Sequence, residues 1–135
     1  MKRILVLMCG LIISFSFLGC TSQNAKTEKL RDLEFTVLDK DDIPESFMEE
    51  IAKRVEKGFK LTFEDQGYLY IAEGYGAQET SGYSIEVAEL YESENAIYVQ
   101  TDLIGPANDE EIVERPTYPY IVLKTESVDK NVVFR

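Results

Sequence analysis

The sequence contains no histidine and no tryptophan, and its only two cysteines are Cys9 and Cys20. The missing histidine excludes Cys-His and Ser-His nucleophile pairs, and it removes the commonest general base and the commonest zinc ligand. Because both cysteines lie within the first twenty residues, the rest of the chain can form no disulfide and carries no free thiol. These absences point to a protein that works without histidine or thiol chemistry.

Positive charge is scarce and unevenly placed. The chain has 14 basic and 25 acidic residues, a formal net charge of −11, and neither Lys nor Arg occurs between Leu61 and Glu114. An acidic surface repels phosphates, so we expect no nucleic-acid partner. The acidic stretch predicts a flank that faces water or a basic partner.

The N-terminus has the layout of a bacterial lipoprotein signal. Lys2 and Arg3 precede the apolar run Ile4–Leu18, and Gly19 stands directly before Cys20. The run is shorter than the roughly 20 residues of a membrane-spanning helix but is normal for a signal core. A plain secretory signal and an uncleaved anchor are the alternatives. We expect fatty acyl chains such as palmitate on Cys20, which would hold the protein on the extracytoplasmic side of a bacterial cell membrane or outer membrane.

This signal sets the predicted domain organisation. Residues 1–19 are expected to be removed, residues 20–31 are polar and predict a flexible tether, and residues 32–135 predict a single globular domain. Cleavage would leave 116 residues with 12 basic and 25 acidic side chains, a net charge of −13. The lipid, rather than a basic patch, would therefore have to hold the protein at a membrane.

One helix is predicted near the start of the domain. Phe47, Ile51 and Val55 lie on a single helical stripe, and Asp42 or Ser46 is suited to the N-cap. A stripe of this kind normally packs on a sheet, although it is also typical of partner-binding amphipathic helices.

Alternating apolar residues predict strands over most of the remaining domain. A first strand is expected at 33–38, and further strands are expected at 59–64, 68–72, 83–88, 97–103, 118–124 and 132–135. The strands at 59–64 and 68–72 form a hairpin, and a bulge is expected near Glu89. Short turns between sequential strands favour antiparallel pairing. The expected fold class is mainly β: a compact antiparallel β-sandwich or curled sheet of about six strands with one N-terminal amphipathic helix.

Two loops carry unusual compositions. Gly74–Gly82 is rich in glycine but lacks the Lys-Ser or Lys-Thr of a phosphate loop, so its glycines are better explained by tight turns with positive φ. Asn108–Glu114 holds four carboxylates, which would suit Ca²⁺, but the spacing does not match an EF-hand loop. We expect a solvated acidic loop there, with no metal and no cofactor. Tyr75 is suited equally to an interface and to packing.

The order of these motifs resembles the C-terminal domain of the PrcB family of lipoproteins. The resemblance covers about residues 59–134 and rests on a Gly-bearing turn after a strand, a Thr-x-Gly-Tyr unit entering the next strand, and two later prolines. In this sequence those positions are Thr80, Gly82, Tyr83, Pro106 and Pro119. The sequence departs from the family pattern at Glu79 and in the acidic loop after Pro106.

The resemblance implies a non-catalytic protein-binding module, an accessory or stabilising subunit of an extracytoplasmic protease complex. Its partner would be a protein, by resemblance a protease, and no small-molecule substrate is expected. A weaker resemblance to chagasin-type cysteine protease inhibitors gives the alternative. It rests on Thr80–Tyr83 and on Arg115-Pro116, and it implies inhibition through loops placed in a protease cleft.

Overall fold

The computed structural model describes residues 28–135. The predicted signal peptide, Cys20 and the tether as far as residue 27 lie outside the described residues. The elements follow one another as β1 (Lys29–Asp32), β2 (Thr36–Val37), the 3-10 helix η3 (Lys40–Asp42), α1 (Glu45–Ala52), β3 (Phe59–Asp65), β4 (Tyr68–Gly74), β5 (Ser84–Ser93), β6 (Ala96–Ile104), β7 (Tyr120–Glu126) and β8 (Asn131–Phe134). No helix in this part of the chain is long and apolar enough to cross a membrane.

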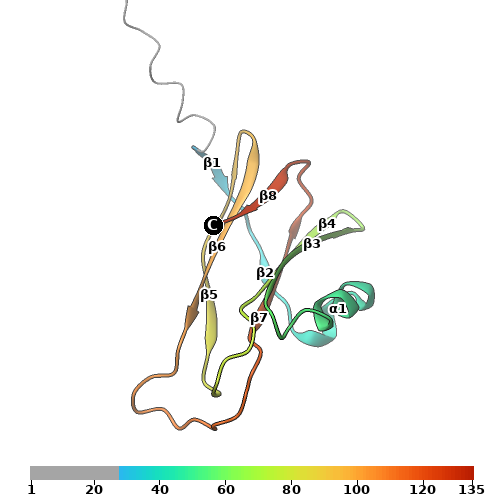
Figure 1. Cartoon of the computed structure of the whole chain (residues 1–135). Helices are drawn as coiled ribbons and strands as arrows, with labels where there is room; N and C mark the ends of the chain where they lie inside the picture. The colour runs from blue at the N-terminus through green and yellow to red at the C-terminus, as the bar shows by residue number, and fades with distance from the viewer. Residues whose placement is uncertain (1–27) are drawn as a thin grey trace, which may run out of the picture.

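The strands form two four-stranded sheets that lie over one another, with α1 beside the second sheet (Figure 1). We call them sheet A, in the order β1-β5-β6-β8, and sheet B, in the order β2-β7-β4-β3. The chain enters through β1 at the edge of sheet A and crosses to β2 at the edge of sheet B. The sheets are therefore linked at one side by the segment that joins β1 to β2.

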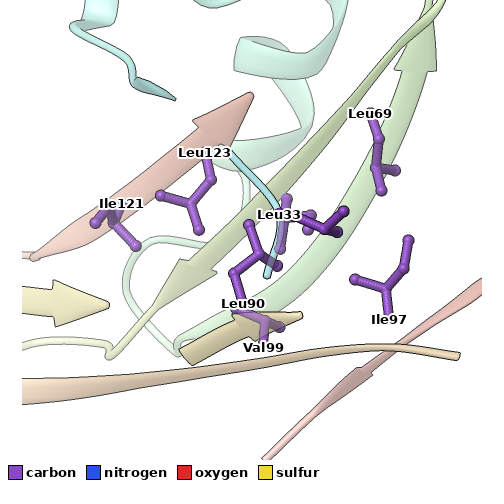
Figure 2. Close-up of a cluster of buried hydrophobic side chains, with 8 residues drawn as sticks. Leu33, Leu69, Leu90, Ile97, Val99, Ile121 and Leu123 are labelled. Carbon is purple, nitrogen blue, oxygen red and sulfur yellow. The ribbon is translucent and has the colours of Figure 1, made fainter. Parts of the chain in front are cut away.

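The main hydrophobic core lies between the sheets (Figure 2). Sheet B contributes Leu69 and Ile71 from β4, and sheet A contributes Ile97 and Val99 from β6. Leu33, from the crossing segment, is buried in the same cluster, although the sequence predicted a strand there. Apolar residues at alternate positions of facing strands thus bring the two sheets together.

A second core lies on the other face of sheet B, against α1. Phe47 and Ile51 of the helix are buried, and the Phe47 ring stacks on Phe63 with centroids 5.1 Å apart. Tyr70 and Ala72 of β4 belong to this second cluster. Residues 68–72 of β4 form a continuous apolar run, as expected for a strand that meets sheet A on one face and the helix on the other.

The predicted turns and bulge are confirmed. Gln66 and Gly67, at the turn between β3 and β4, have φ angles of 50° and 83°, the pair of positive values that a two-residue hairpin turn requires. The pairing of β5 with β6 shifts register between Val87 and Glu89, where the sequence predicted a bulge.

The mainly β class with one helix is confirmed, but three details of the prediction are wrong. The domain has eight strands in two sheets rather than about six, and β8 pairs with β6 in parallel. Edge strand β1 was not predicted, and only Thr36–Val37 of the strand predicted at 33–38 is paired, as edge strand β2. The helix begins after Pro44, without a side-chain cap from Asp42 or Ser46, and ends at Ala52 rather than continuing past Val55.

The boundary of the tether also needs correction. Lys29–Asp32 form β1 and pair with β5, although the sequence placed most of them in the tether. All four residues of β1 are exposed, so their side chains gave no hydrophobic signal. The strand is instead held by backbone pairing and by the ion pair of Arg31 with Glu92, whose atoms are 2.7 Å apart.

Candidate protein-binding site

The conspicuous sequence motifs gather in two long loops at one end of the molecule. These are the loop of residues 75–83, between β4 and β5, and the loop of residues 105–119, between β6 and β7. Figure 1 shows both loops at the end opposite to β1, where the described chain begins. We call them together the loop pair.

Hydrogen bonds join the two loops along their length. The amides of Gln78 and Thr117 each donate to the carbonyl of the other residue, at 2.8 and 3.0 Å. The Ser81 amide donates to the Val113 carbonyl, and the Val113 amide donates back to the Ser81 hydroxyl at 2.8 Å. The Thr117 hydroxyl donates to the Thr80 carbonyl at 2.7 Å. Because most of these bonds use backbone groups, the loop pair is held as one unit that is rigid at its base.

Gly82 lies where the two loops approach each other closely, next to Pro106. Gly82 has a φ angle of +95°, a backbone conformation that residues with a side chain rarely adopt. A Cβ placed on Gly82 would lie 2.7 Å from the Cβ of Pro106. The positive φ that the sequence predicted for this glycine is confirmed. Gly82 is therefore required both for the backbone conformation and for the close approach of the second loop.

Tyr75 links the base of the loop pair to both sheets. Its amide donates to the Pro119 carbonyl at 3.1 Å, and its hydroxyl hydrogen-bonds with the Thr101 hydroxyl of β6. Thr101 in turn donates to the buried carboxylate of Glu73 on β4, at 2.9 Å. Burial raises the pKa of the Tyr75 hydroxyl above its usual value, and the carboxylates of Glu73 and Asp102 add to this rise.

The family-motif residues thus lie together, and the contacts of most of them point into the protein. Tyr83 is half-buried beside Gly105, and Thr80 donates its hydroxyl to the neighbouring Ser81 carbonyl at 3.0 Å. Since the Tyr75 hydroxyl is engaged with Thr101, its contacts favour the packing interpretation. These residues shape the loops, and other residues form their outer surface.

The outer surface of the loop pair is apolar and acidic. Ile112 and Val113 are 41% and 55% exposed, and Ile104, at the end of β6, is 38% exposed. None of these three residues belongs to a motif that was predicted from the sequence. The available signal was an apolar pair inside an acidic loop, where no strand or helix could bury it. Exposed apolar side chains on a hydrogen-bonded framework are typical of a protein-binding surface.

The acidic loop makes local contacts of its own, and the Glu110 amide donates to the Ala107 carbonyl at 3.0 Å. The Glu110 carboxylate accepts the Ala107 amide at 3.1 Å, which closes a turn. Within residues 28–135, no three or more acidic, His or Cys side chains are grouped so that they could hold a metal ion. The four acidic residues of the loop are exposed, as predicted for a solvated loop.

A broad groove of about 890 Å³ lies away from the loops, between β1 and β2. Arg31, Glu34, Phe35 and Lys124 are among its lining residues, and the Lys124 ammonium lies 4.1 Å from the ring centroid of Tyr68. The groove contains no family-motif residue, so we place the candidate site at the loop pair.

Comparison with known proteins identifies one family. No curated protein and no solved structure matches the chain. Residues 69–126, from β4 through β7, match the family model described as PrcB C-terminal. The match includes the whole loop pair. The resemblance inferred from the sequence is confirmed over this range: residues 69–126 form a PrcB C-terminal-type domain.

Proposed function

We propose that this protein is a lipid-anchored, non-catalytic accessory subunit that binds another protein outside the cytoplasm, in a complex related to proteolysis. The observation that carries the proposal is the loop pair, which presents Ile112 and Val113 to solvent on a framework fixed by hydrogen bonds. The association with a protease complex is what the resemblance to PrcB implies, and the family match at residues 69–126 supports it. The chain binds through surface complementarity and breaks no bond.

The position of the loop pair fits a protein held at its N-terminus. Strand β1, which follows the proposed tether, lies at the opposite end of the domain from the loops (Figure 1). Lipid on Cys20 would then leave the loop pair facing away from the membrane. An acidic tip that points outward also avoids repulsion by anionic lipid headgroups.

Two experiments test the anchor and the absence of catalysis. Cys20→Ala removes the acyl-accepting thiol, so the variant should leave the detergent phase in which the wild type partitions. Equal partitioning of the two would refute the anchor. The purified chain should show no hydrolysis of peptide, ester or glycoside substrates with or without divalent metal. Turnover that disappears in Glu110→Gln or Glu114→Gln would refute the non-catalytic proposal.

The second candidate function is direct inhibition of a protease through the loops. The convergence of two loops at one end of the domain favours it. An inhibitor must insert loop tips into a cleft, however, and the hydroxyl of Tyr75 is bound to Thr101 inside the domain. We therefore expect no inhibition of papain-like proteases at micromolar concentrations. Tight inhibition that is lost in a folded variant of Glu79 would make the inhibitor the better explanation.

A further inference from the structure

We propose that the outer face of sheet A beside the loop pair binds a basic segment of the partner protein. This inference rests on the proposed function and specifies where the partner binds and what its chemistry is. The surface, which we call the acidic face, consists of Glu86 and Glu89 of β5 and Asp102 of β6. Ile104 and Ile112 adjoin it on the side of the loops.

The orientation of the acidic face follows from the strand alternation. Ile85 and Val87 pack against the core between the sheets, so Glu86 points outward. Thr101 is buried and donates to Glu73 of the opposite sheet, so Asp102 also points outward. Glu86 and Asp102 are both exposed, and they are direct cross-strand partners in the pairing of β5 with β6.

Two carboxylates directly opposite each other on a sheet repel and destabilise it. No ion pair within residues 28–135 relieves this repulsion, because the acidic residues in the ion pairs of this part of the chain are Asp32, Glu50 and Glu92. The fold thus keeps an uncompensated acidic pair at an exposed position. A partner that brings positive charge would remove the repulsion on binding.

Cations cover the other half of the same sheet surface. The Lys29 ammonium lies 5.4 Å from the ring centroid of Tyr91, and the Arg135 guanidinium lies 4.4 Å from that of Tyr98. The charge of Lys29 also acts on Glu89, but no ion pair within residues 28–135 includes Glu86 or Asp102. Positive charge that complements Glu86 and Asp102 would therefore come from another molecule. Because nucleic acid and anionic lipid are themselves negatively charged, a basic protein segment fits this surface.

Apolar side chains continue the acidic face onto the loop pair. Ile104 is the cross-strand partner of Ser84 and, two residues after Asp102, lies on the same outer face. A methyl group of Ile112 lies 3.4 Å from the position that a Cβ on Gly82 would occupy, so this side chain adjoins the start of β5. The surface fits a segment that carries Lys or Arg next to apolar residues, with apolar burial for affinity and charge for placement.

Site-specific photo-crosslinking of the full-length protein in its own cells tests the proposal. A photoreactive residue replaces Ser84, which is exposed on the acidic face, or Thr62, which is exposed on β3 as the control. We expect an adduct at position 84 and a much weaker one at 62. The cross-linked partner peptide, identified by mass spectrometry, should contain Lys or Arg, and the adduct should weaken as salt increases.

Charge neutralisation provides the matched comparison. The double variant Glu86→Gln, Asp102→Asn should lower the yield of the adduct at position 84 roughly three- to tenfold, the effect expected for two exposed ion pairs. The control Glu49→Gln, Glu56→Gln removes the same charge from exposed positions in and after α1 and should leave the yield unchanged.

Each outcome separates the inference from the proposed function. An adduct at 62 but not at 84 would overturn the acidic face as the binding surface and leave the accessory function standing. Equal loss of adduct in both double variants, or a cross-linked peptide without basic residues, would overturn the basic chemistry of the partner. The absence of any adduct at either position would overturn both proposals.

Discussion

Substituting three glycines by alanine separates the two roles that the structure gives to Gly82. Gly67 has a φ angle of +83° and open space where a Cβ would lie, so Gly67→Ala introduces backbone strain alone. Gly74 has no positive φ, but its Cβ would overlap the ring of the buried Phe59, so Gly74→Ala introduces a contact alone. Gly82→Ala introduces both, because φ is +95° and the Cβ of Pro106 would be 2.7 Å away.

The expected magnitudes follow from these two terms. A non-glycine residue in the left-handed region costs about 1–2 kcal/mol, and an overpacked contact costs about 1–3 kcal/mol. Each substitution also restricts the unfolded chain by a similar small amount, which cancels when the variants are compared. We therefore expect Gly82→Ala to lower the free energy of unfolding by about 2–5 kcal/mol, more than Gly67→Ala. For a domain of this size, that corresponds to a fall in Tm on the order of 10 °C.

Urea and thermal unfolding of residues 21–135, which lack the lipidated cysteine, provide the assay. The three variants should unfold with the slope of the wild type and differ only in their midpoints. If Gly82→Ala unfolds at the same midpoint as Gly67→Ala, the second loop moves away from the added methyl group without cost. The loop pair would then not be a fixed unit, and its use as a rigid binding surface would be refuted.

Three further predictions concern β1, the ion pairs of Glu92 and the buried hydroxyl of Tyr75. Deleting residues 29–32 together with the tether should lower the Tm by several degrees, because β1 pairs with β5. Deletion only up to residue 28 should leave the Tm unchanged, and equal Tm values for the two deletions would show that β1 adds no stability. Hydrogen bonds from Lys130 and Arg31 hold the pKa of the Glu92 carboxyl below its ordinary value of 4.5. The stabilisation from these ion pairs is therefore present above pH 4.5 and is lost as the pH falls through the lowered pKa. Glu92→Gln should therefore destabilise the domain at neutral pH and lessen the loss on acidification, and an unchanged pH profile would contradict this. Tyr75→Phe removes the hydrogen bond to Thr101 and should lower the free energy of unfolding in urea by about 0.5–1.5 kcal/mol. The variant should still bind the partner, and a folded variant that no longer binds would place Tyr75 in the interface.

Local patterns were sufficient to predict the central strands from the sequence. The alternation at 59–64 and 97–103 identified β3 and β6, and Gly67 marked the turn between β3 and β4, because these features depend on neighbouring residues alone. The family resemblance over the motif residues was also available without the structure. The sequence alone likewise predicts the lipid signal, which lies outside the described residues.

Other features depend on contacts between distant segments. Strand β1 is fully exposed and does not show the alternation by which a strand is recognised. The alternation at 33–38 predicted a strand that includes β2, but only Thr36 and Val37 of that range pair with β7. The parallel pairing of β8 with β6 brings together residues separated by more than thirty positions. The apolar stripe continues to Val55, which lies beyond the end of α1 but still packs on the second core. The pattern of apolar residues alone therefore placed the end of the helix too late.

The division between sequence and structure is clearest at the candidate site. Composition determined that the middle of the chain is acidic and contains neither histidine nor thiol, since those properties need only the identity of each residue. Only the tertiary structure decided which side chains face outward. The strand register sets Glu86 opposite Asp102, and the hydrogen-bonded loops turn Tyr75 inward while leaving Val113 in solvent. Exposure is a property of the packed chain, because it depends on what the rest of the fold covers.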